Sequence, residues 1–255
     1  MSDRHATLTQ HTLHDKLLGE RLGRQLWCAK TAYVSALAVL SALAVLAHYY
    51  AYFSWDPAAA RALQALRLPG IPAVMRAVSL FGDQGVSDLM IAATVVVFLL
   101  LRWPGEAAAL LLSAVGSQTI YRVLKQLVAR PRPAPDLVTV YGDFTGRSFP
   151  SGHVTFYVCY FGFLFFVAYV RLPCGSVVRR VVQLTAALLI ILIGPSRVYL
   201  GAHWPSDTIG SYLTGGLWLA LSLYVYRRFK TDGTDEAAES DAHLTASCCR
   251  DVPAP

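Results

Sequence analysis

Charged side chains are scarce in this chain of 255 residues, of which Lys, Arg, Asp and Glu make up only 15%. An ordinary soluble domain carries about 25% of these residues. Hydrophobic residues reach 55%, and the mean hydropathy is +0.45. The scarcity of charge therefore argues against an ordinary soluble domain and points to a chain that lies in a lipid bilayer.

Cysteine is also rare, and the five cysteines show neither an even framework nor the spacing of a metal site. We interpret them as free thiols. A secretory signal peptide is not recognisable, because the first 28 residues are polar and mixed in charge and the first apolar run is too long for such a signal. The sequence also shows no internal repeat, which leaves one continuous membrane domain as the simplest organisation.

Long apolar runs are what the chain has in abundance. A helix needs roughly 20 apolar residues to cross the hydrocarbon core, within a range of about 17–25. Six stretches reach or approach this length with almost no formal charge: residues 31–53, 85–101, 107–121, 154–170, 181–196 and 208–226. We therefore expect an all-α, polytopic membrane protein with six transmembrane helices in a bundle.

Polar segments flank and interrupt the expected membrane domain, which covers residues 31–229. We expect residues 1–30 to form a cytosolic N-terminal tail. Residues 230–255 are rich in Asp, Glu, Ala, Ser and Thr, which is typical of a disordered cytosolic tail. Residues 56–81 predict two short amphipathic helices, the first capped by Asp56, which lie either in the membrane interface or in an ordinary loop.

The net charge of +6 would suggest nucleic-acid binding in a soluble protein, but here the basic residues follow the membrane topology. Lys and Arg collect in short cytoplasmic loops. With both termini in the cytoplasm, six spans place most of the basic residues on the inner side, and we expect no nucleic-acid partner. The topology does not explain a cluster on the outer side, formed by Lys125, Arg130, Arg132, Arg147 and Arg197.

Three polar segments gather on that outer face and are here called the outer segments. The first, KQLVARPRP at residues 125–133, ends the third span. The second, FPSGH at residues 149–153, precedes the fourth span, and the third, SRVYLGAHWPSD at residues 196–207, joins the last two spans. Each segment alone is compatible with an ordinary helix end at the lipid head groups. Ordinary helix ends do not explain why all three segments lie on the same face of the membrane.

Each outer segment carries groups suited to an anion. Lys125, Arg132 and Arg197 supply three cations, and an arginine can bind a phosphate through two parallel hydrogen bonds. The helix start near Gly152 offers backbone N–H groups to an anion and lets the backbone approach it closely. The three segments together therefore predict a phosphate site, where stabilising the charge of a phosphoryl group is most of the catalytic task.

Two histidines lie among these groups. His203 and Asp207 are four residues apart, and Pro205 starts the last helix between them, so that the imidazole and the carboxylate can form a hydrogen bond. A carboxylate on one ring nitrogen fixes the tautomer and leaves the other nitrogen free to react. His153 lies within one turn of the membrane rim, where a lone histidine can also be an ordinary interfacial side chain.

At these residues the chain resembles the type 2 phosphatidic acid phosphatase (PAP2) superfamily, in its membrane lipid phosphatase branch. The resemblance covers roughly residues 31–226, and no position of the three-part signature departs from the pattern. In chain order the signature positions are Lys125, Arg132 and Pro133, then Pro150, Ser151, Gly152 and His153, then Ser196, Arg197, His203 and Asp207.

The resemblance implies a role for each polar signature residue. His203 would be the nucleophile that forms a phosphohistidine, Asp207 would orient it, and His153 would be the general acid. The phosphate oxygens would be held by Lys125, Arg132, Arg197, Ser151 and the Gly152 N–H. No metal and no cofactor is implied.

Several other polar residues fall outside the signature. We interpret Arg130 and Arg147 as head-group contacts or plain surface, with the second interpretation favoured. Asp83 and Asp88 flank the second span and are interpreted as helix caps.

The resemblance implies an integral membrane lipid phosphatase, in a bacterial cytoplasmic membrane, with its active site on the periplasmic face. Undecaprenyl pyrophosphate is the first substrate expected, and phosphatidylglycerophosphate, phosphatidic acid and lipid A phosphate are alternatives. A vanadate-dependent haloperoxidase is disfavoured by the six spans, and a non-catalytic lipid-binding protein by the complete signature. The expected partners are the bilayer and its lipid substrate, and the sequence does not determine the oligomeric state.

Overall fold

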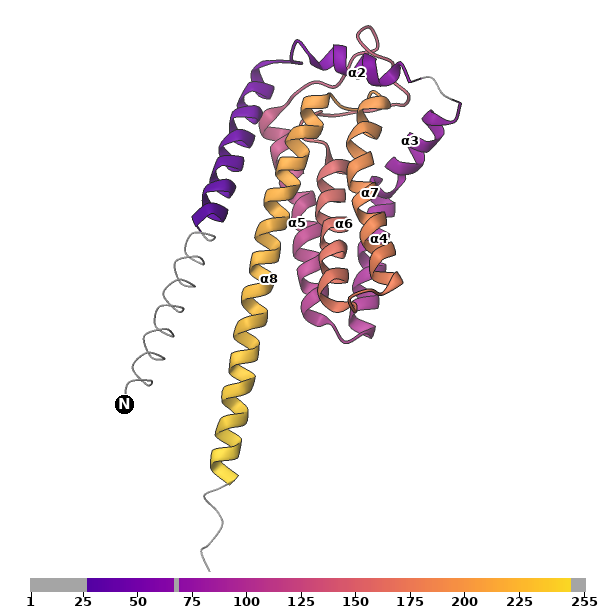
Figure 1. Ribbon diagram of the computed structural model, residues 1–255. Coiled ribbons are helices and arrows are strands. Elements are labelled where there is room, and N and C mark those ends of the chain that lie inside the picture. The colour runs from indigo at the N-terminus through magenta and orange to yellow at the C-terminus, as the bar shows by residue number, and fades with distance from the viewer. Residues whose placement is uncertain (1–26, 67–68, 249–255) are drawn as a thin grey trace, which may run out of the picture. The chain divides into compact units, whose positions relative to one another are not determined.

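The computed structural model describes residues 27–66 and 69–248, with side chains as far as Lys230 (Figure 1). The chain divides into two compact units, residues 1–43 and 44–255, which are considered separately. Every regular element in the described residues is a helix, which confirms the all-α fold class. The expected N-terminal tail lies almost wholly outside the described residues, and the first apolar run forms the helix Trp27–Tyr49.

The second unit continues with seven α-helices and one short 3-10 helix. They are α2 Asp56–Gln64, α3 Ile71–Ser79, η1 Leu80–Gly82, α4 Gln84–Leu100, α5 Pro104–Val128, α6 Gly152–Arg171, α7 Val177–Tyr199 and α8 Pro205–Cys248. A proline stands in the first turn of α2, α3, α5 and α8, where its missing N–H costs no helical hydrogen bond.

Five helices of the described chain are long and apolar enough to cross a membrane, namely Trp27–Tyr49, Pro104–Val128, Gly152–Arg171, Val177–Tyr199 and Pro205–Lys230. Ile71–Gly82 and Gln84–Leu100 pass the same test only as a pair, and these two arms meet at a bend of 56°. Asp83 causes this bend, because its extended backbone (φ −68°, ψ 139°) interrupts the helix. The second predicted amphipathic helix therefore lies in the first arm of this bent pair.

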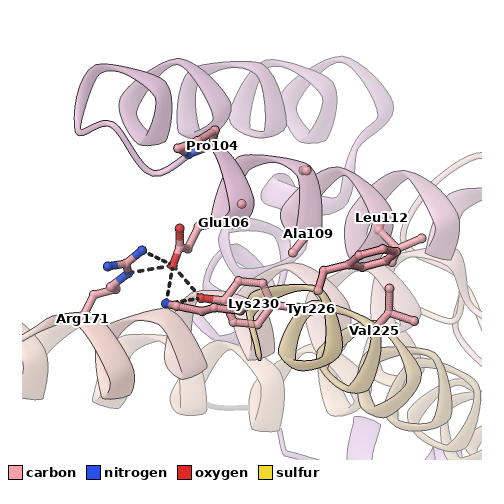
Figure 2. A pocket seen from close by; sticks show the side chains of 11 residues that line it. Pro104, Glu106, Ala109, Leu112, Arg171, Val225, Tyr226 and Lys230 are labelled. Carbon is pink, nitrogen blue, oxygen red and sulfur yellow. Dashed lines mark hydrogen bonds and ion pairs between the residues drawn. The ribbon is translucent and has the colours of Figure 1, made fainter. Parts of the chain in front are cut away.

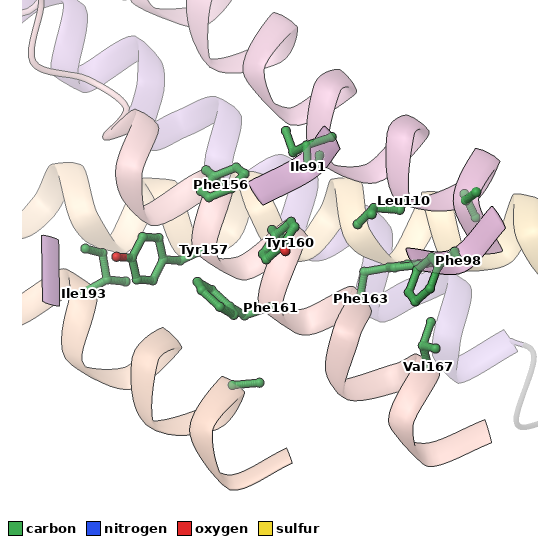
Figure 3. Close-up of a cluster of buried hydrophobic side chains, with 14 of the residues drawn as sticks. Ile91, Phe98, Leu110, Phe156, Tyr157, Tyr160, Phe161, Phe163, Val167 and Ile193 are labelled. Carbon is green, nitrogen blue, oxygen red and sulfur yellow. The ribbon is translucent and has the colours of Figure 1, made fainter. Parts of the chain in front are cut away.

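The central helix is α6, which packs against α5, α7 and α8. In α6, 61% of the most apolar stretch is buried, against at most 39% in each of the other four long apolar helices, so α6 faces protein on most of its sides. Its aromatic side chains form the middle of the core, where Phe156, Tyr157, Tyr160 and Phe161 contact one another (Figure 3). This packing fixes the N-terminus of α6, where the second outer segment ends.

At the other end of the bundle, a buried carboxylate ties three helices together. Glu106 of α5 accepts hydrogen bonds from Arg171 of α6 at 2.5 Å and from Tyr226 of α8 at 2.5 Å, and Lys230 lies 3.4 Å from the same oxygen (Figure 2). A largely apolar cavity of about 420 Å³ lies beside this cluster. Glu106 thus serves the packing of helices, away from the signature residues.

The last helix continues beyond the expected membrane domain. α8 runs to Cys248, so the backbone is helical over much of the segment 230–255 for which the sequence predicts disorder. The physical reason is local: residues 231–248 contain several Ala and Glu, which favour helix, and no proline to stop it. The boundary expected at residue 230 is therefore not an end of the helix.

Candidate active site

The three outer segments meet at one end of the second unit. α5 ends at Val128 and α7 ends at Tyr199, while α6 begins at Gly152 and α8 begins at Pro205. Because antiparallel neighbours alternate in direction, the ends of α5 and α7 and the starts of α6 and α8 lie on the same side (Figure 1). The fold brings the outer segments together, as their order along the chain predicts.

The turn that carries His203 is sterically fixed. Gly201 has a left-handed backbone (φ +70°), and a Cβ at this position would lie 2.3 Å from the Thr139 carbonyl oxygen, so only glycine fits. The Trp204 side chain is buried, and its backbone N–H donates to Asp207 Oδ2 at 2.9 Å. His203 is held between these two fixed points, directly before α8.

A cavity of about 450 Å³ opens between the outer segments and the start of α4. Six of the eight predicted site residues line it: Lys125, Arg132, Gly152, His153, Arg197 and His203. The other two, Ser151 and Asp207, are buried and do not line it. The sequence did not predict the residues of the other wall, which carries polar side chains of α4 and α5 such as Gln84 and Gln118.

Three cations are held in place by hydrogen bonds to the backbone or to a hydroxyl group. Lys125 Nζ donates to the Arg147 carbonyl oxygen at 2.6 Å, and Arg132 donates to the carbonyl oxygens of Thr145 at 2.9 Å and Ala202 at 2.7 Å. Arg197 Nη1 donates to the Ser79 hydroxyl. Because none of these bonds is to a carboxylate, the positive charge of the cavity remains available to an anion.

Two of the guanidinium groups also lie over one aromatic ring. The central carbon of Arg132 is 6.0 Å from the centroid of the Phe144 ring, and that of Arg197 is 5.1 Å from the same centroid. Such cation–π contacts hold an arginine in place without neutralising it. Phe144 belongs to the loop between α5 and α6, and no pattern in the sequence marks it.

His203 is in a state suited to nucleophilic attack. The residue is only 2% exposed, and its Nε2 lies 3.4 Å from Arg132 Nη1 on the cationic side of the site. Burial, together with the charges of Lys125, Arg132 and Arg197, holds the pKa of His203 well below its ordinary value. The imidazole is therefore neutral at neutral pH and keeps a lone pair on one ring nitrogen.

Asp207 supports His203 less directly than the sequence predicts. Asp207 Oδ2 lies 3.8 Å from His203 Nδ1, beyond hydrogen-bond distance. The hydroxyl of Ser148 donates to the same oxygen at 2.5 Å and lies 3.4 Å from Nδ1. Ser148 thus connects the carboxylate to the imidazole. No pattern in the sequence marks this residue, which lies one position before the second outer segment.

Arg130 departs most from its predicted place. It is 1% exposed, with Nη1 at 2.6 Å from Asp207 Oδ1 and Nη2 at 3.0 Å from Asp56 Oδ2. The interpretation of Arg130 as a head-group contact or plain surface is therefore wrong. Arg147 is exposed and donates to the Ala129 carbonyl oxygen at 2.9 Å, which agrees with its interpretation as surface.

Three predicted helix caps have other partners. Asp56 is buried and accepts bonds from Arg130 and from the backbone N–H of Ser206 at 3.0 Å. Asp83 stands at the N-cap position of α4 but makes no capping bond, and its Oδ1 lies 3.1 Å from His153 Nε2. Asp88 likewise bonds two side chains, Gln84 and Gln118.

Gly82, beside Asp83, permits the close approach of His153. A Cβ on Gly82 would lie 2.4 Å from the imidazole Cδ2 of His153, closer than atoms can approach. The bend between η1 and α4 therefore places two groups beside His153: the carboxylate of Asp83, and Gly82, which leaves room for the imidazole because it has no side chain.

Three buried donors have no partner among the residues that the structure describes. They are the Ser151 hydroxyl, the Nε of Arg197 and the indole Nε1 of Trp204. The backbone N–H of Ser151 is already used, since it donates to the Ser211 hydroxyl at 2.6 Å. Buried polar groups are normally hydrogen-bonded, so unpaired donors beside a cationic cavity indicate a ligand with acceptor oxygens.

The fold and the site together define a polytopic helical membrane protein with a cation-lined cavity for an anion and two histidines in its wall, which is the arrangement of a membrane phosphatase. The chain belongs to the PAP2 superfamily, whose family model matches residues 106–231. It is an integral membrane lipid phosphatase, which sets aside the haloperoxidase and the non-catalytic binding protein.

Two curated proteins and one solved structure show the relationship. The chain is 29% identical over 179 residues to phosphatidylglycerophosphatase B of Bacillus subtilis (strain 168), covering 68% of this chain and 84% of that protein. It is 33% identical over 156 residues to a lipid A 1-phosphatase of Rhizobium etli, covering 58% of this chain and 61% of that protein. The crystal structure of a transmembrane PAP2-type phosphatidylglycerolphosphate phosphatase from Bacillus subtilis matches with a TM-score of 0.67 and 27% identity, covering 77% of this chain and 96% of that one.

Proposed function

We propose that the chain removes phosphate from a membrane lipid through a covalent phosphohistidine at His203. The observation that carries this proposal is the cavity itself, in which His203, His153 and three cations face one space of about 450 Å³. The unpaired Arg197 Nε beside this space suits an oxygen of the bound phosphate. A neutral imidazole keeps a lone pair with which it can attack phosphorus, and the neighbouring cations hold the phosphate anion in front of it.

In the first step, His203 Nε2 attacks the phosphorus atom. A nitrogen–phosphorus bond forms while the bond from phosphorus to the lipid oxygen breaks, and His153 gives a proton to that leaving oxygen. The developing charge on the other three phosphate oxygens is stabilised by Lys125, Arg132 and Arg197.

In the second step, water attacks the phosphohistidine. His153, now neutral, accepts a proton from the water, the nitrogen–phosphorus bond breaks, and inorganic phosphate leaves. Because fixed cations supply the charge stabilisation in both steps, we expect phosphate release to continue in the presence of a chelator.

We place the enzyme in a bacterial cytoplasmic membrane, with both termini inside and the cavity on the periplasmic face. The distribution of basic residues supports this orientation, since Arg171, Arg179 and Arg180 lie in or next to the loop between α6 and α7, at the opposite end from the cavity. Short loops rich in Arg are typical of the cytoplasmic side.

Undecaprenyl pyrophosphate is the first substrate that we propose. Its diphosphate carries more negative charge than a monoester, and the cavity offers three cations without carboxylate partners. Phosphatidylglycerophosphate is the second candidate, because Gln84 and Gln118 in the opposite wall present amides suited to glycerol hydroxyls. Similarity to phosphatidylglycerophosphatase B also favours this second candidate.

Phosphate release by the purified, detergent-solubilised protein tests the proposal, with undecaprenyl pyrophosphate, phosphatidylglycerophosphate, phosphatidic acid and lipid A as separate substrates. His203→Ala is expected to abolish release from every lipid, and brief acid-free quenching of the wild type should trap a phosphohistidine. Near-wild-type turnover by His203→Ala, or a strict requirement for added Mg²⁺, would overturn the mechanism.

A further inference from the structure

Arg130 occupies the centre of a buried network that links α2 and α8, two helices far apart in the sequence. Its guanidinium lies between Asp56 of α2 and Asp207 of α8, at 3.0 Å and 2.6 Å, and all three side chains are fully buried. Ser206 completes the network, because its hydroxyl donates to Asp56 at 2.7 Å and lies 2.8 Å from Arg130 Nη1. The Phe53 ring covers the guanidinium at 4.7 Å from its centroid.

This network is separate from the cations that face the cavity. Arg130 does not line the cavity, whereas Lys125, Arg132 and Arg197 do. Its donors are used on Asp56, Asp207, Ser206 and the Tyr50 carbonyl oxygen, which leaves it enclosed by protein. A guanidinium enclosed in this way has no access to the phosphate and can act only through the residues that it holds.

The residue that Arg130 holds is the carboxylate next to the nucleophile. Arg130 engages Oδ1 of Asp207, and the Ser148 hydroxyl and the Trp204 N–H engage Oδ2, which faces His203. A buried carboxylate keeps its charge only when it is paired and hydrogen-bonded. The cation therefore both stabilises the charge of Asp207 and fixes the direction of the oxygen that reaches His203 through Ser148.

We propose that Arg130 is a positioning residue for the nucleophile. Through Asp207 and Ser148 it keeps the proton of His203 on Nδ1 and the lone pair on Nε2, while Asp56 and Ser206 hold Arg130 in turn. This inference rests on the proposed function, in which His203 attacks phosphorus. It also assigns a purpose to Asp56, which ties the short helix α2 to the catalytic centre.

Kinetics of the full-length protein in detergent test the inference, with the variants Arg130→Gln, Arg130→Lys, Ser148→Ala and Asp56→Asn. The matched control is Arg147→Gln, which removes a nearby exposed guanidinium. Arg130→Gln is expected to lower kcat by about 10–100-fold, the range typical when a residue that orients a metal-bound histidine is lost, with KM within about twofold. Arg130→Lys should recover part of kcat, because a lysine restores the charge but cannot bridge both carboxylates.

A second measurement separates positioning from folding. Ser148→Ala deletes one hydroxyl between Asp207 and His203 and is expected to lower kcat with little change in KM or in the temperature at which the protein aggregates. If Arg130→Gln does not fold, Ser148→Ala and Asp56→Asn decide the question, and wild-type kcat in both overturns the inference.

The remaining outcomes distinguish a failure of the positioning role from a failure of the proposed mechanism. An unchanged kcat in Arg130→Gln, or a raised KM with kcat unchanged, overturns the positioning role. If His203→Ala is inactive while Arg130→Gln and Ser148→Ala turn over like Arg147→Gln, the proposed mechanism stands and this inference fails. If His203→Ala turns over normally, the mechanism itself fails.

Discussion

At the residue scale, the protonation state of His203 determines the pH range in which the site works. Burial and three neighbouring cations hold its pKa well below the ordinary value, so the ring stays neutral as the pH falls through about 6.5. A group with a lowered pKa takes up its proton only at a more acid pH. The acidic limb of the rate profile should therefore lie below the pKa of a free histidine.

Removing one of these cations should move that limb in a known direction. Arg132→Gln takes away the guanidinium 3.4 Å from His203 Nε2, which allows the pKa of His203 to rise toward its ordinary value. The fall of kcat/KM at acid pH, which reports the free enzyme, should then begin at a higher pH. Measurement from pH 4.5 to 8 against Arg147→Gln decides this, and a limb that stays or moves lower contradicts it.

Gly82 gives a steric prediction for His153. Gly82→Ala would place a methyl group 2.4 Å from the imidazole Cδ2, so the ring must move away from its place in the cavity wall. A displacement of about 1 Å can cost on the order of 100-fold in rate. Gly85→Ala is the matched control, because nothing lies within 4 Å of a Cβ there. Equal kcat in the two variants would count against a precise position for His153.

The spacing of residues in the chain predicted the cavity-lining side chains but not the groups behind them. Lys125, Arg132 and His203 could be placed because each lies at a helix end that the apolar runs define. Asp56 and Asp83 meet Arg130 and His153 across separations of about 70 residues, and no local pattern encodes such a pairing. Two arginines that flank one proline look alike in a sequence, and only the packing shows which of them is buried.

At the scale of elements, substitution of the buried Glu106 tests how much its ion pairs contribute to holding α5, α6 and α8 together. Glu106→Gln removes the charge that pairs with Arg171 while leaving the cavity at the other end untouched. Because Arg171 is partly exposed, we expect a loss of about 1–3 kcal/mol, below the value for a fully buried pair. The measurement is the midpoint of thermal aggregation in detergent.

Asp136→Asn provides the comparison for this variant, because it removes an exposed carboxylate of the same chain. In both variants, Glu106→Gln and Asp136→Asn, the fraction of protein that remains folded should show wild-type kcat. A selective loss of kcat in Glu106→Gln, with no change in thermal stability, would mean that the cluster acts on the active site and does not merely join helices.

Helix positions followed from the sequence wherever a run of apolar residues had clear ends. The run 154–170 became α6, which is longer by one or two residues at each end, and the run 181–196 became α7, which is longer by three or four residues at each end. The segment 56–81 was harder to predict, because Ile71–Gly82 is short by itself and is apolar and long enough for a membrane only together with α4. Hydropathy averaged along the chain does not reveal that two helical pieces meet at a bend.

At the scale of the whole molecule, the proposed orientation predicts which thiols meet the outside. Cys174 is exposed in the loop between α6 and α7, at the end away from the cavity. In a variant that keeps Cys174 alone, a membrane-impermeant maleimide should label the protein only after the cells are permeabilised. A cysteine-free protein carrying Asp143→Cys, in the exposed loop beside the cavity, should be labelled in cells with an intact cytoplasmic membrane. The reverse pattern would invert the topology.

The bend of 56° between η1 and α4 has a consequence for the supply of water. A break in a helix exposes backbone polar groups, and a bilayer tolerates them only where protein covers them or where a water-filled space meets them. Gly82, Asp83 and Gln84 at this break all line the cavity, so the polar groups freed by the bend face a polar space and not lipid. We therefore expect the water that releases phosphate from His203 in the proposed second step to reach the site from the side where the helix pair bends.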